Sequence, residues 1–564
     1  MSWYYAAIEA LCWIVIFIML RHALFRGKYL LHIFQQNGYK LNEFSAWLVR
    51  RWSTTLLPVP HLSLILLTLV ANHYLEPLLT TSAIAVVIFI FAAFWFGSVG
   101  AYTSTQVKKP LVFTPRMIRL ATVFVLLGVW IPLAGTAYSF YSGTLFPDMY
   151  ILVIAWIFAD LVLPYLLILA AALAYPAEML IQYRFKRMAR KKIESMPDLR
   201  VIAITGSYGK TSTKFLLDSV LKERFRVCTT PGSYNTPMGI CKVINNDLQA
   251  GDQILILEMG ARYEGNIDEL CRIARPDIAV VTNVGVAHLE SFGSVDAIAY
   301  TKGALIRHLP PGGTALLNGD DEHVRGMVSR EDISVIHAGI TPENNQIHAD
   351  GITYDENGCS FTLVVKPESV IGGGKSDEKS GEKGGSERVT MALLGLHSVQ
   401  NALLAAAAGL TMGLRLPTVK VALQKAQPVE HRLELKKRNG VLVIDDAFNS
   451  NPIGAKNAVS VLAAFKKGKK FVVTPGMIEL GEIQDEENRQ FGLHMARNAP
   501  DHIYLVGQNQ TRPIYDGLRE GGYPDEAITV VSSLFEANDL LRERLADGDV
   551  VLYENDLPDS YSEG

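Results

Sequence analysis

The stretch Thr205-Gly206-Ser207-Tyr208-Gly209-Lys210-Thr211 lies between an apolar run, 200–205, that predicts a strand and an amphipathic run, 212–221, that predicts a helix. A glycine-containing turn that opens a helix presents backbone N–H groups, which bind phosphate oxygens. Lys210 adds a positive charge, and the Thr211 hydroxyl is a suitable ligand for Mg²⁺. The common phosphate loop has a further glycine where this chain has Ile204, so the pattern here is the shorter Gly-x-x-Gly-Lys-Thr. The stretch therefore predicts a phosphate-binding turn in an α/β domain.

Short apolar runs alternate with amphipathic stretches along the rest of residues 199–564. The runs that predict further strands are 254–258, 278–282, 315–318, 441–445, 471–474, 502–506 and 550–553. Strands that alternate with helices are typical of parallel α/β sheets. We therefore predict two α/β domains, over residues 195–414 and 415–564. The Gly-, Ser- and charge-rich segment 371–388 predicts a flexible loop within the first of them.

Residues 1–183 differ from the remainder of the chain in charge. They contain 10 Lys+Arg and 6 Asp+Glu, whereas the whole chain of 564 residues contains 53 and 56. Five apolar segments have about the length that a membrane-spanning helix needs, namely 6–20, 56–71, 82–98, 120–137 and 150–174. The second contains Pro58 and Pro60, and it is either a span or a re-entrant segment. An α-helical membrane domain of about five spans, over residues 1–194, is the prediction.

The positions of Lys and Arg predict the topology of this membrane domain. They are concentrated in the connections after the first, third and fifth apolar segments, and the other two connections contain none. Because cytoplasmic connections are rich in basic residues, we expect a multi-pass protein of the plasma membrane with both α/β domains in the cytoplasm. Asp160 lies inside the fifth segment, and it is a candidate for either a functional carboxylate or a helix-packing residue.

Composition excludes several classes of protein. A net charge of −3 provides no general attraction to nucleic acid, so we expect no nucleic-acid partner. The five cysteines are scattered without a Cys-x-x-Cys pair, which argues against a disulfide framework and a zinc ribbon. With 49% hydrophobic residues the chain is not a disordered protein.

Further motifs follow the phosphate stretch in a fixed order. They are 257–261 (LEMGA), 282–290 (TNVGVAHLE), 300–303 (YTKG), 395–401 (GLHSVQN), 431–432 (HR) and 445–452 (DDAFNSNP). Together with the short phosphate loop, this set resembles the Mur ligases, which form amide bonds with ATP in cell-wall peptide assembly. The resemblance covers about residues 195–555. Segments 445–452 and 477–481 (MIELG) are similar to the subgroup that adds D-alanyl-D-alanine to UDP-muramoyl-tripeptide.

The resemblance implies a Mur-ligase central ATP-binding domain followed by a Rossmann-like C-terminal domain, and it assigns roles to residues. The implied catalytic residues are Lys210, Glu258, His288 and Lys302. The implied ATP-binding residues are Gly206, Ser207, Gly209, Lys210, Thr211, Asn401, Arg432 and Asp446, with Asn401 on the adenine. Two Mg²⁺ ions would be held by Thr211, Glu258 and His288, and Lys302 would carry a carbamate.

The chain departs from the family pattern in the parts that handle the acceptor. Membrane segments occupy the place of the uridine-binding domain, and the Lys-Gly-Ser motif near the C-terminus is absent. Ser398 stands where the family has Asn, and Asn488 where it has His. The ATP machinery is therefore matched better than the acceptor machinery.

We expect a membrane-anchored, ATP- and Mg²⁺-dependent carboxylate–amine ligase that acts through an acyl phosphate. The expected partners are a cell-wall or lipid-linked peptide acceptor, an amino acid or dipeptide donor, and membrane lipid. A conventional ligase of nucleotide-linked muramoyl tripeptide with a passive anchor is one alternative, and a polyglutamate-type ligase is another. Outside this class stand an ATP-driven transporter and an inert scaffold.

Overall fold

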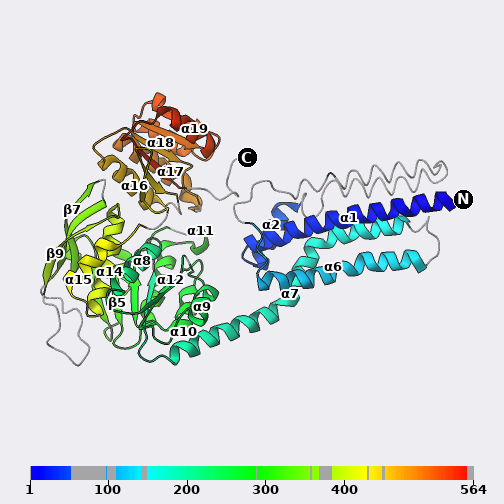
Figure 1. The fold of residues 1–564 in the computed structure, drawn as a ribbon, viewed down its shortest axis with the longest axis horizontal. Helices are drawn as coiled ribbons and strands as arrows, with labels where there is room; N and C mark the ends of the chain where they lie inside the picture. The colour runs from blue at the N-terminus through cyan, green and yellow to red at the C-terminus, as the bar shows by residue number, and fades with distance from the viewer. Residues whose placement is uncertain are drawn as a thin grey trace. The chain divides into compact units, whose positions relative to one another are not determined.

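In the computed structural model the chain forms two compact units, residues 1–182 and 183–564. Figure 1 shows the fold. The structure describes residues 2–52, 97, 110–141, 149–232, 234–286, 289–328, 330–355, 358–366, 384–428, 431–447, 451–478 and 480–555.

The first unit is helical. Its described helices are α1 (Ser2–Gln36), α2 (Leu41–Arg50), α6 (Pro115–Tyr141) and the first part of α7 (Met149–Glu194). The predicted spans 6–20, 120–137 and 150–174 lie inside α1, α6 and α7, and the other two lie outside the described residues except for position 97. Within the described residues, one helical stretch, Phe158–Glu194, is long and apolar enough to cross a membrane.

Asp160 is fully buried on α7 and joins that helix to α1. Its carboxylate pairs with the guanidinium of Arg26, and Nδ1 of His22 lies 3.2 Å from its Oδ1. Arg26 also donates to the main-chain oxygen of Asp160. Glu178, further along α7, similarly accepts from Nε of Arg119 on α6 at 2.6 Å. These contacts agree with the helix-packing alternative for Asp160, and a functional role of its carboxylate stays a prediction.

The second unit contains a nine-stranded sheet with the order β2-β3-β1-β4-β5-β6-β7-β8-β9. Pairing is parallel from β2 to β7 and antiparallel from β7 to β9. The strands are β1 (Arg200–Thr205), β2 (Val227–Thr229), β3 (Ile254–Glu258), β4 (Ile278–Val281), β5 (Thr314–Asn318), β6 (Ser334–Ala338), β7 (Ile347–Asp355), β8 (Gly358–Val365) and β9 (Gly385–Met391).

Helices cover both faces of this sheet because both faces of its central strands are apolar. Ile202 and Ile204 of β1 pack with α8 (Lys210–Leu221), α14 (Leu396–Thr411) and α15 (Leu416–Lys425). Val201 and Ala203 face the other way, toward α9 (Pro237–Asn246), α10 (Asn266–Ala274) and α12 (Val295–Arg307). Short helices α11 (Leu289–Phe292) and α13 (Glu322–Arg325) lie in the connections around α12.

A six-stranded sheet follows, with the order β10-β11-β15-β12-β13-β14 and only the β10–β11 pair antiparallel. Its strands are β10 (Glu434–Arg438), β11 (Val441–Asp446), β12 (Lys470–Thr474), β13 (His502–Val506), β14 (Ile528–Val531) and β15 (Val550–Glu554). Helices α16 (Pro452–Ala464), α17 (Gln484–Asn498) and α18 (Arg512–Glu520) pack on one face, and α19 (Leu534–Arg544) packs on the other. This is a doubly wound, Rossmann-like arrangement.

The predicted strands are confirmed to within one residue at each end, and two segment boundaries differ. Residues 385–388, expected at the end of a loop, begin β9 because they pair with β8, with Gly385 opposite Val365. Residues 371–383 of that loop lie outside the described residues. Helix α15 packs into the core of the nine-stranded sheet, so it belongs with the first α/β block, although the sequence placed it in the second.

Candidate active site

The turn between β1 and α8 is held in place by the segment that follows β4. Ser207 N donates to Asn283 O at 2.9 Å, and Tyr208 N donates to Asn283 Oδ1 at 2.8 Å. Ser207 Oγ exchanges hydrogen bonds with the backbone of Gly285, at 2.8 and 3.0 Å. Strands β1 and β4 are neighbours in the sheet, and the connections after them lead to opposite sides of the sheet, so the topological switch point lies between them. Ligands of open α/β sheets bind at such a point, at the carboxyl ends of the strands.

Both glycines of the turn are required by close contacts. A Cβ atom on Gly206 would lie 1.9 Å from Thr282 Oγ1. Gly209 has a φ of +78°, a left-handed conformation that favours glycine, and a Cβ atom on it would lie 2.7 Å from Asn401 Oδ1. The backbone therefore comes closer to its neighbours than any larger residue allows, as expected of a turn that wraps a ligand.

Lys210 closes over this turn. Its Nζ donates to the main-chain oxygens of Gly206 at 2.8 Å and Ser207 at 3.2 Å. Burial lowers the pKa of Lys210; the carboxylate of Glu258 opposes this shift and the charge of Arg432 adds to it. The ammonium group of Lys210 is therefore close enough to the turn to bind a phosphate group there, in place of the main-chain oxygens of Gly206 and Ser207.

Glu258, at the end of β3, is the acidic centre of the site and is 1% exposed. Its Oε2 accepts from Thr211 Oγ1 at 3.0 Å and lies 3.4 Å from Lys214 Nζ. Its Oε1 accepts from Asn235 Nδ2 at 3.2 Å. Both carboxylate oxygens are therefore fixed, one by the helix after the turn and the other by the loop before α9.

Lys302 lies on α12 and is 4% exposed. Burial lowers the pKa of its amine well below the usual value of a lysine, and the charge of Lys210 lowers it further. Lys302 is therefore a lysine that the protein environment favours in its neutral, nucleophilic form.

Two side chains at the start of α14 lie against the same site. Asn401 Oδ1 accepts from Thr213 Oγ1 on α8 at 3.0 Å and lies beside Gly209. The ring of His397 packs against Gly395, and burial lowers the pKa of that imidazole to about 4, with the charge of Arg432 contributing. Helix α14 thus contacts the phosphate turn and α8 through Asn401. The expected contact of Asn401 with adenine stays a prediction.

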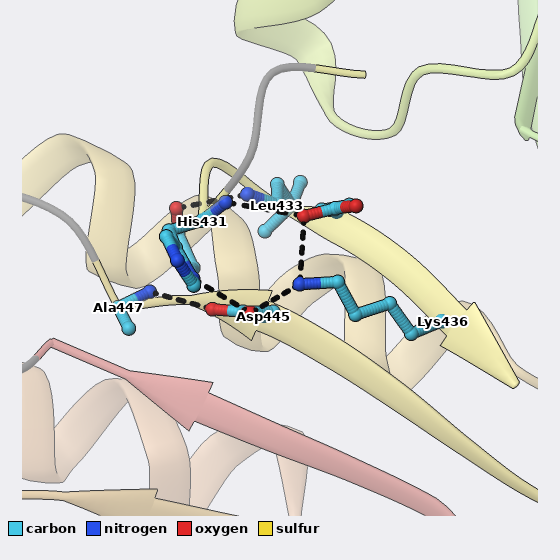
Figure 2. A network of polar contacts seen from close by, with 7 residues as sticks. His431, Leu433, Lys436, Asp445 and Ala447 are labelled. Atoms are coloured by element: carbon cyan, nitrogen blue, oxygen red, sulfur yellow. Dashed lines mark hydrogen bonds and ion pairs between the residues drawn. The ribbon is translucent and has the colours of Figure 1, made fainter. Parts of the chain in front are cut away.

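The C-terminal sheet contributes a network around Asp445 (Figure 2). Asp445 Oδ2 lies 2.9 Å from His431 Nδ1 and 2.7 Å from Lys436 Nζ. Burial would raise the pKa of Asp445, but the hydrogen bonds from Lys436 and His431 outweigh it and hold the pKa below its usual value. Asp445 is therefore a structural anchor for the hairpin of β10 and β11.

Asp446, next in the chain, has a different environment. Its Oδ1 accepts from the backbone N–H of Leu433 at 3.0 Å. Burial raises the pKa of Asp446 to about 6, and Arg432 partly opposes that shift. Arg432 in turn interacts electrostatically with both Glu258 and Asp446. Arg432 thus connects Glu258, at the end of β3 in the nine-stranded sheet, with Asp446, at the end of β11 in the six-stranded sheet.

Not every expected site residue falls within the described residues. His288, Glu479 and residues 448–450 lie outside them, so their predicted roles stay predictions. Asn488 is described and buried: its Nδ2 donates to Met477 O at 2.9 Å and its Oδ1 accepts from Met477 N at 2.9 Å. This side chain holds the loop after β12 in place.

Sequence reasoning missed Lys214, Thr213 and Asn235. Lys214 lies one helical turn after Lys210, and this spacing of four residues was a signal for a second lysine on the same side of α8. Its ammonium also hydrogen-bonds the main-chain oxygen of Gly232, in the loop that carries Asn235. That loop has no charged residue and offered no comparable signal.

The residues at Glu258 suit a Mg²⁺ ion. A hydroxyl and a carboxylate oxygen, from Thr211 and Glu258, lie 3.0 Å apart, and both are hard ligands. Among the described residues no group of three or more His, Cys, Asp and Glu side chains is gathered around one point. Mg²⁺ typically uses one or two protein ligands and completes its shell with water and phosphate oxygens, so a sparse site of this kind fits it.

Family models and relatives agree with this arrangement. A model of the Mur ligase middle domain matches residues 204–409, and a model of the Mur ligase glutamate ligase domain matches residues 431–553. The UDP-N-acetylmuramoyl-tripeptide–D-alanyl-D-alanine ligase of Mycobacterium tuberculosis is 34% identical over 373 residues, which are 63% of this chain and 70% of the relative. This chain belongs to the Mur ligase family. The ligase of the same name from Bacillus subtilis is 29% identical to this Mur ligase over 360 residues, 63% of the chain and 72% of the relative.

Solved structures are similar to the Mur ligase unit of the chain. MurF from Acinetobacter baumannii is 27% identical, with a TM-score of 0.57 over 66% of this chain and 77% of that one. The MurF ligase of Thermotoga maritima, solved in complex with ADP, is also 27% identical, with a TM-score of 0.56 over 66% of this chain and 80% of that one. The expectation of an ATP-dependent amide ligase with two Mur-type α/β domains is confirmed.

Proposed function

We propose that this Mur ligase is membrane-anchored and joins D-alanyl-D-alanine, or a similar amine, to a muramoyl peptide carboxylate during peptidoglycan synthesis. The observation that carries the proposal is the joint placement of the phosphate turn, Glu258, Lys302 and Arg432 in one site. The relatives named for D-alanyl-D-alanine addition support the identity of the donor.

The charges of the site suit transfer of a phosphoryl group from ATP to a carboxylate. Three cations, Lys210, Lys214 and Arg432, interact with a single carboxylate, Glu258, and Nζ of Lys214 lies 3.4 Å from its Oε2. This excess of positive charge is what the triphosphate and the transition state of phosphoryl transfer require. The acyl phosphate so formed is then attacked by the donor amine, which expels inorganic phosphate and leaves the amide.

Magnesium is the proposed cofactor, with two ions in the site. Thr211 and Glu258 would hold one, and His288 is the expected ligand of the second. Bound Mg²⁺ neutralises charge on the phosphate oxygens during transfer. The chain's own contribution is to fix both carboxylate oxygens of Glu258 through Thr211 and Asn235.

A carbamate on Lys302 is part of the same proposal. A neutral amine attacks carbon dioxide, forming a C–N bond and releasing one proton, and the product is an anion. Burial and the neighbouring Lys210 favour the neutral amine. The resulting negative charge would pair with the ammonium group of Lys210, which repels a protonated Lys302.

The first unit, residues 1–182, is proposed to lie in the membrane and is called the membrane half below; it motivates a second candidate for the acceptor. Helix α7 contains the candidate membrane span Phe158–Glu194 and ends in the unit that carries the site. A lipid-linked muropeptide would be held near the membrane that this helix is proposed to cross. The nucleotide-linked tripeptide named for the relatives is the alternative acceptor, and with it the helices would serve as an anchor.

Phosphate release by the full-length protein in detergent, combined with mass analysis of the products, tests these proposals. The acceptors are nucleotide-linked muramoyl tripeptide and lipid-linked muropeptide, and the donors are D-alanyl-D-alanine and single amino acids. Amide product with the lipid-linked acceptor alone would favour the lipid-linked proposal. Product with the nucleotide-linked acceptor would favour the anchored conventional ligase. Product with neither acceptor under any donor would reject the proposed substrates.

A further inference from the structure

The end of α7, residues 183–194, has two different faces. The inner face packs on the nine-stranded sheet's helices: Ala189 is fully buried there, and Ile193 packs against the same core. Lys186 pairs with Glu269 of α10, and Lys192 Nζ donates to Asn245 O at the end of α9, at 3.0 Å. Asn245 Nδ2 returns a hydrogen bond to Phe185 O at 3.2 Å. The inner face of the helix end therefore packs against the second unit and is hydrogen-bonded to it.

The opposite face carries three cations, which we call the outer stripe: Arg184, Arg187 and Lys191. All three are exposed, and in the part of the chain that the structure describes none of them has an ion-pair or hydrogen-bond partner. Their spacing of three and four residues places them on one side of the helix. Arg190, by contrast, pairs with Glu194 at 2.9 Å. The outer stripe is therefore a row of uncompensated positive charge.

Apolar side chains accompany the outer stripe. Tyr183 is 60% exposed, Met188 is 56% exposed and Phe185 is 37% exposed. Aromatic and long apolar side chains beside Lys and Arg are typical of segments that lie at the boundary between headgroups and acyl chains. Exposed side chains of this kind next to three cations therefore favour a face that contacts lipid over one that contacts only water.

The same helix indicates the partner. Residues 158–182 of α7 are the apolar part that is proposed to cross the bilayer, and the outer stripe begins two residues later. Clusters of Lys and Arg directly beside a membrane span bind the anionic headgroups of the cytoplasmic leaflet. The whole chain has a net charge of −3, so this attraction is local to the stripe and is not a property of the protein as a whole.

We propose that the outer stripe binds the phosphate groups of anionic phospholipids, while the inner face of the same helix end holds the catalytic unit. This inference rests on the proposed membrane anchoring. The helix end would then fix the catalytic unit at the surface of the anionic leaflet through ordinary charge complementarity.

Selectivity for spin-labelled lipids tests the proposal. Full-length protein is reconstituted in phosphatidylcholine vesicles that contain a trace of spin-labelled phosphatidylglycerol or spin-labelled phosphatidylcholine. The lipids that the protein immobilises give a separate spectral component, from which a relative association constant follows. We expect a preference for phosphatidylglycerol that falls about threefold or more in the variant Arg184→Gln/Arg187→Gln/Lys191→Gln, because each cation near an anionic headgroup contributes separately.

A matched variant, Lys466→Gln/Lys467→Gln/Lys469→Gln, removes the same charge from the exposed turn between α16 and β12 and should keep the preference. The preference of the wild type should also weaken at high ionic strength and persist with added inorganic phosphate at low concentration. Equal association of both lipids, or an unchanged preference in the stripe variant, would overturn the stripe as a lipid site. Absence of any immobilised lipid would instead reject the membrane anchoring itself.

Discussion

The environment of Lys302 favours the carbamate formation proposed for it, whereas the amine of an ordinary surface lysine is protonated at neutral pH. Its lowered pKa, caused by burial and by Lys210, supplies the neutral amine that carbamate formation needs. We predict that Lys302→Ala lowers phosphate release at least 100-fold, because the proposed carbamate anion cannot form. Addition of short carboxylic acids should restore part of this activity, since they can occupy the space of the carbamate. Phosphate release at saturating ATP is the measurement.

A matched variant distinguishes this chemistry from simple damage to the site. Lys210→Ala should lose phosphate release to a similar degree, because its ammonium contacts the phosphate turn. Carboxylic acids should not restore it, since the missing group is a cation. Equal rescue of both variants, or full activity of either, would contradict the assigned roles.

Lys214 is buried beside Glu258 and is one of the three residues of the site that the sequence did not reveal. Its side chain is 0% exposed, and its ammonium lies 3.4 Å from Glu258 Oε2. We predict that Lys214→Met lowers the free energy of unfolding by about 3 kcal/mol, because removing one partner of a buried ion pair leaves the other charge uncompensated. Denaturant unfolding of the full-length protein in detergent measures this loss. Lys222→Met, which removes an exposed lysine from an i,i+4 pair at the end of the same helix, should change it by less than about 1 kcal/mol.

At the scale of elements, the start of α14 makes the fold sensitive to acid. Burial lowers the pKa of His397 from 6.5 to about 4, so the unfolded chain binds a proton in this range and the native protein does not. Stability is therefore complete above pH 6.5 and falls as the pH decreases toward 4. The loss attributable to His397 is on the order of 3 kcal/mol. His397→Gln should flatten the pH dependence of thermal unfolding between pH 6.5 and 4, and an unchanged slope would show that other groups cause it.

The elements that the sequence predicts correctly are those with a strong local signal. Strands β1, β3 and β13 were predicted with their observed bounds, because each is a short apolar run with polar residues on either side. The start of β9 was missed because Gly385–Arg388 has the composition of a loop, and only pairing with β8 makes it a strand. Likewise, the role of α15 depends on packing against distant strands, which no local pattern reports.

The candidate site divides in the same way. The phosphate turn follows β1 directly and Glu258 is the last residue of β3, so their proximity could be predicted from the rule that parallel strands end at one edge. The support of Gly209 by Asn401, almost two hundred residues later, was not accessible from spacing. Neither was the link between Lys214 and the loop that carries Asn235, because that contact depends on the packing of α8 and not on the sequence near it.

For the whole molecule, the contacts of α7 decide where the membrane half can be removed. The sequence suggests a boundary near residue 194, but Ala189 and Lys186 already belong to the core and surface of the catalytic unit. We predict that residues 183–564 form a folded protein and that residues 195–564 are less stable by about 2 kcal/mol or more, because the second piece exposes apolar surface that the helix end covers. Comparison of the two unfolding midpoints measures this difference, and equal midpoints would show that the helix end is dispensable.

The same piece, residues 183–564, separates the two uses proposed for the membrane half. It retains the phosphate turn, Glu258, Lys302 and Arg432, so phosphate release with a nucleotide-linked acceptor should stay within a factor of about three of the full-length value if the helices are only an anchor. If the helices hold a lipid-linked acceptor, kcat/KM for that acceptor should fall at least tenfold, because binding energy from the lipid part is lost. The ratio of the two losses, measured in one detergent, is the decisive quantity. An equal loss for both acceptors would indicate damage to the catalytic unit and would contradict a specific role of the membrane half in acceptor binding.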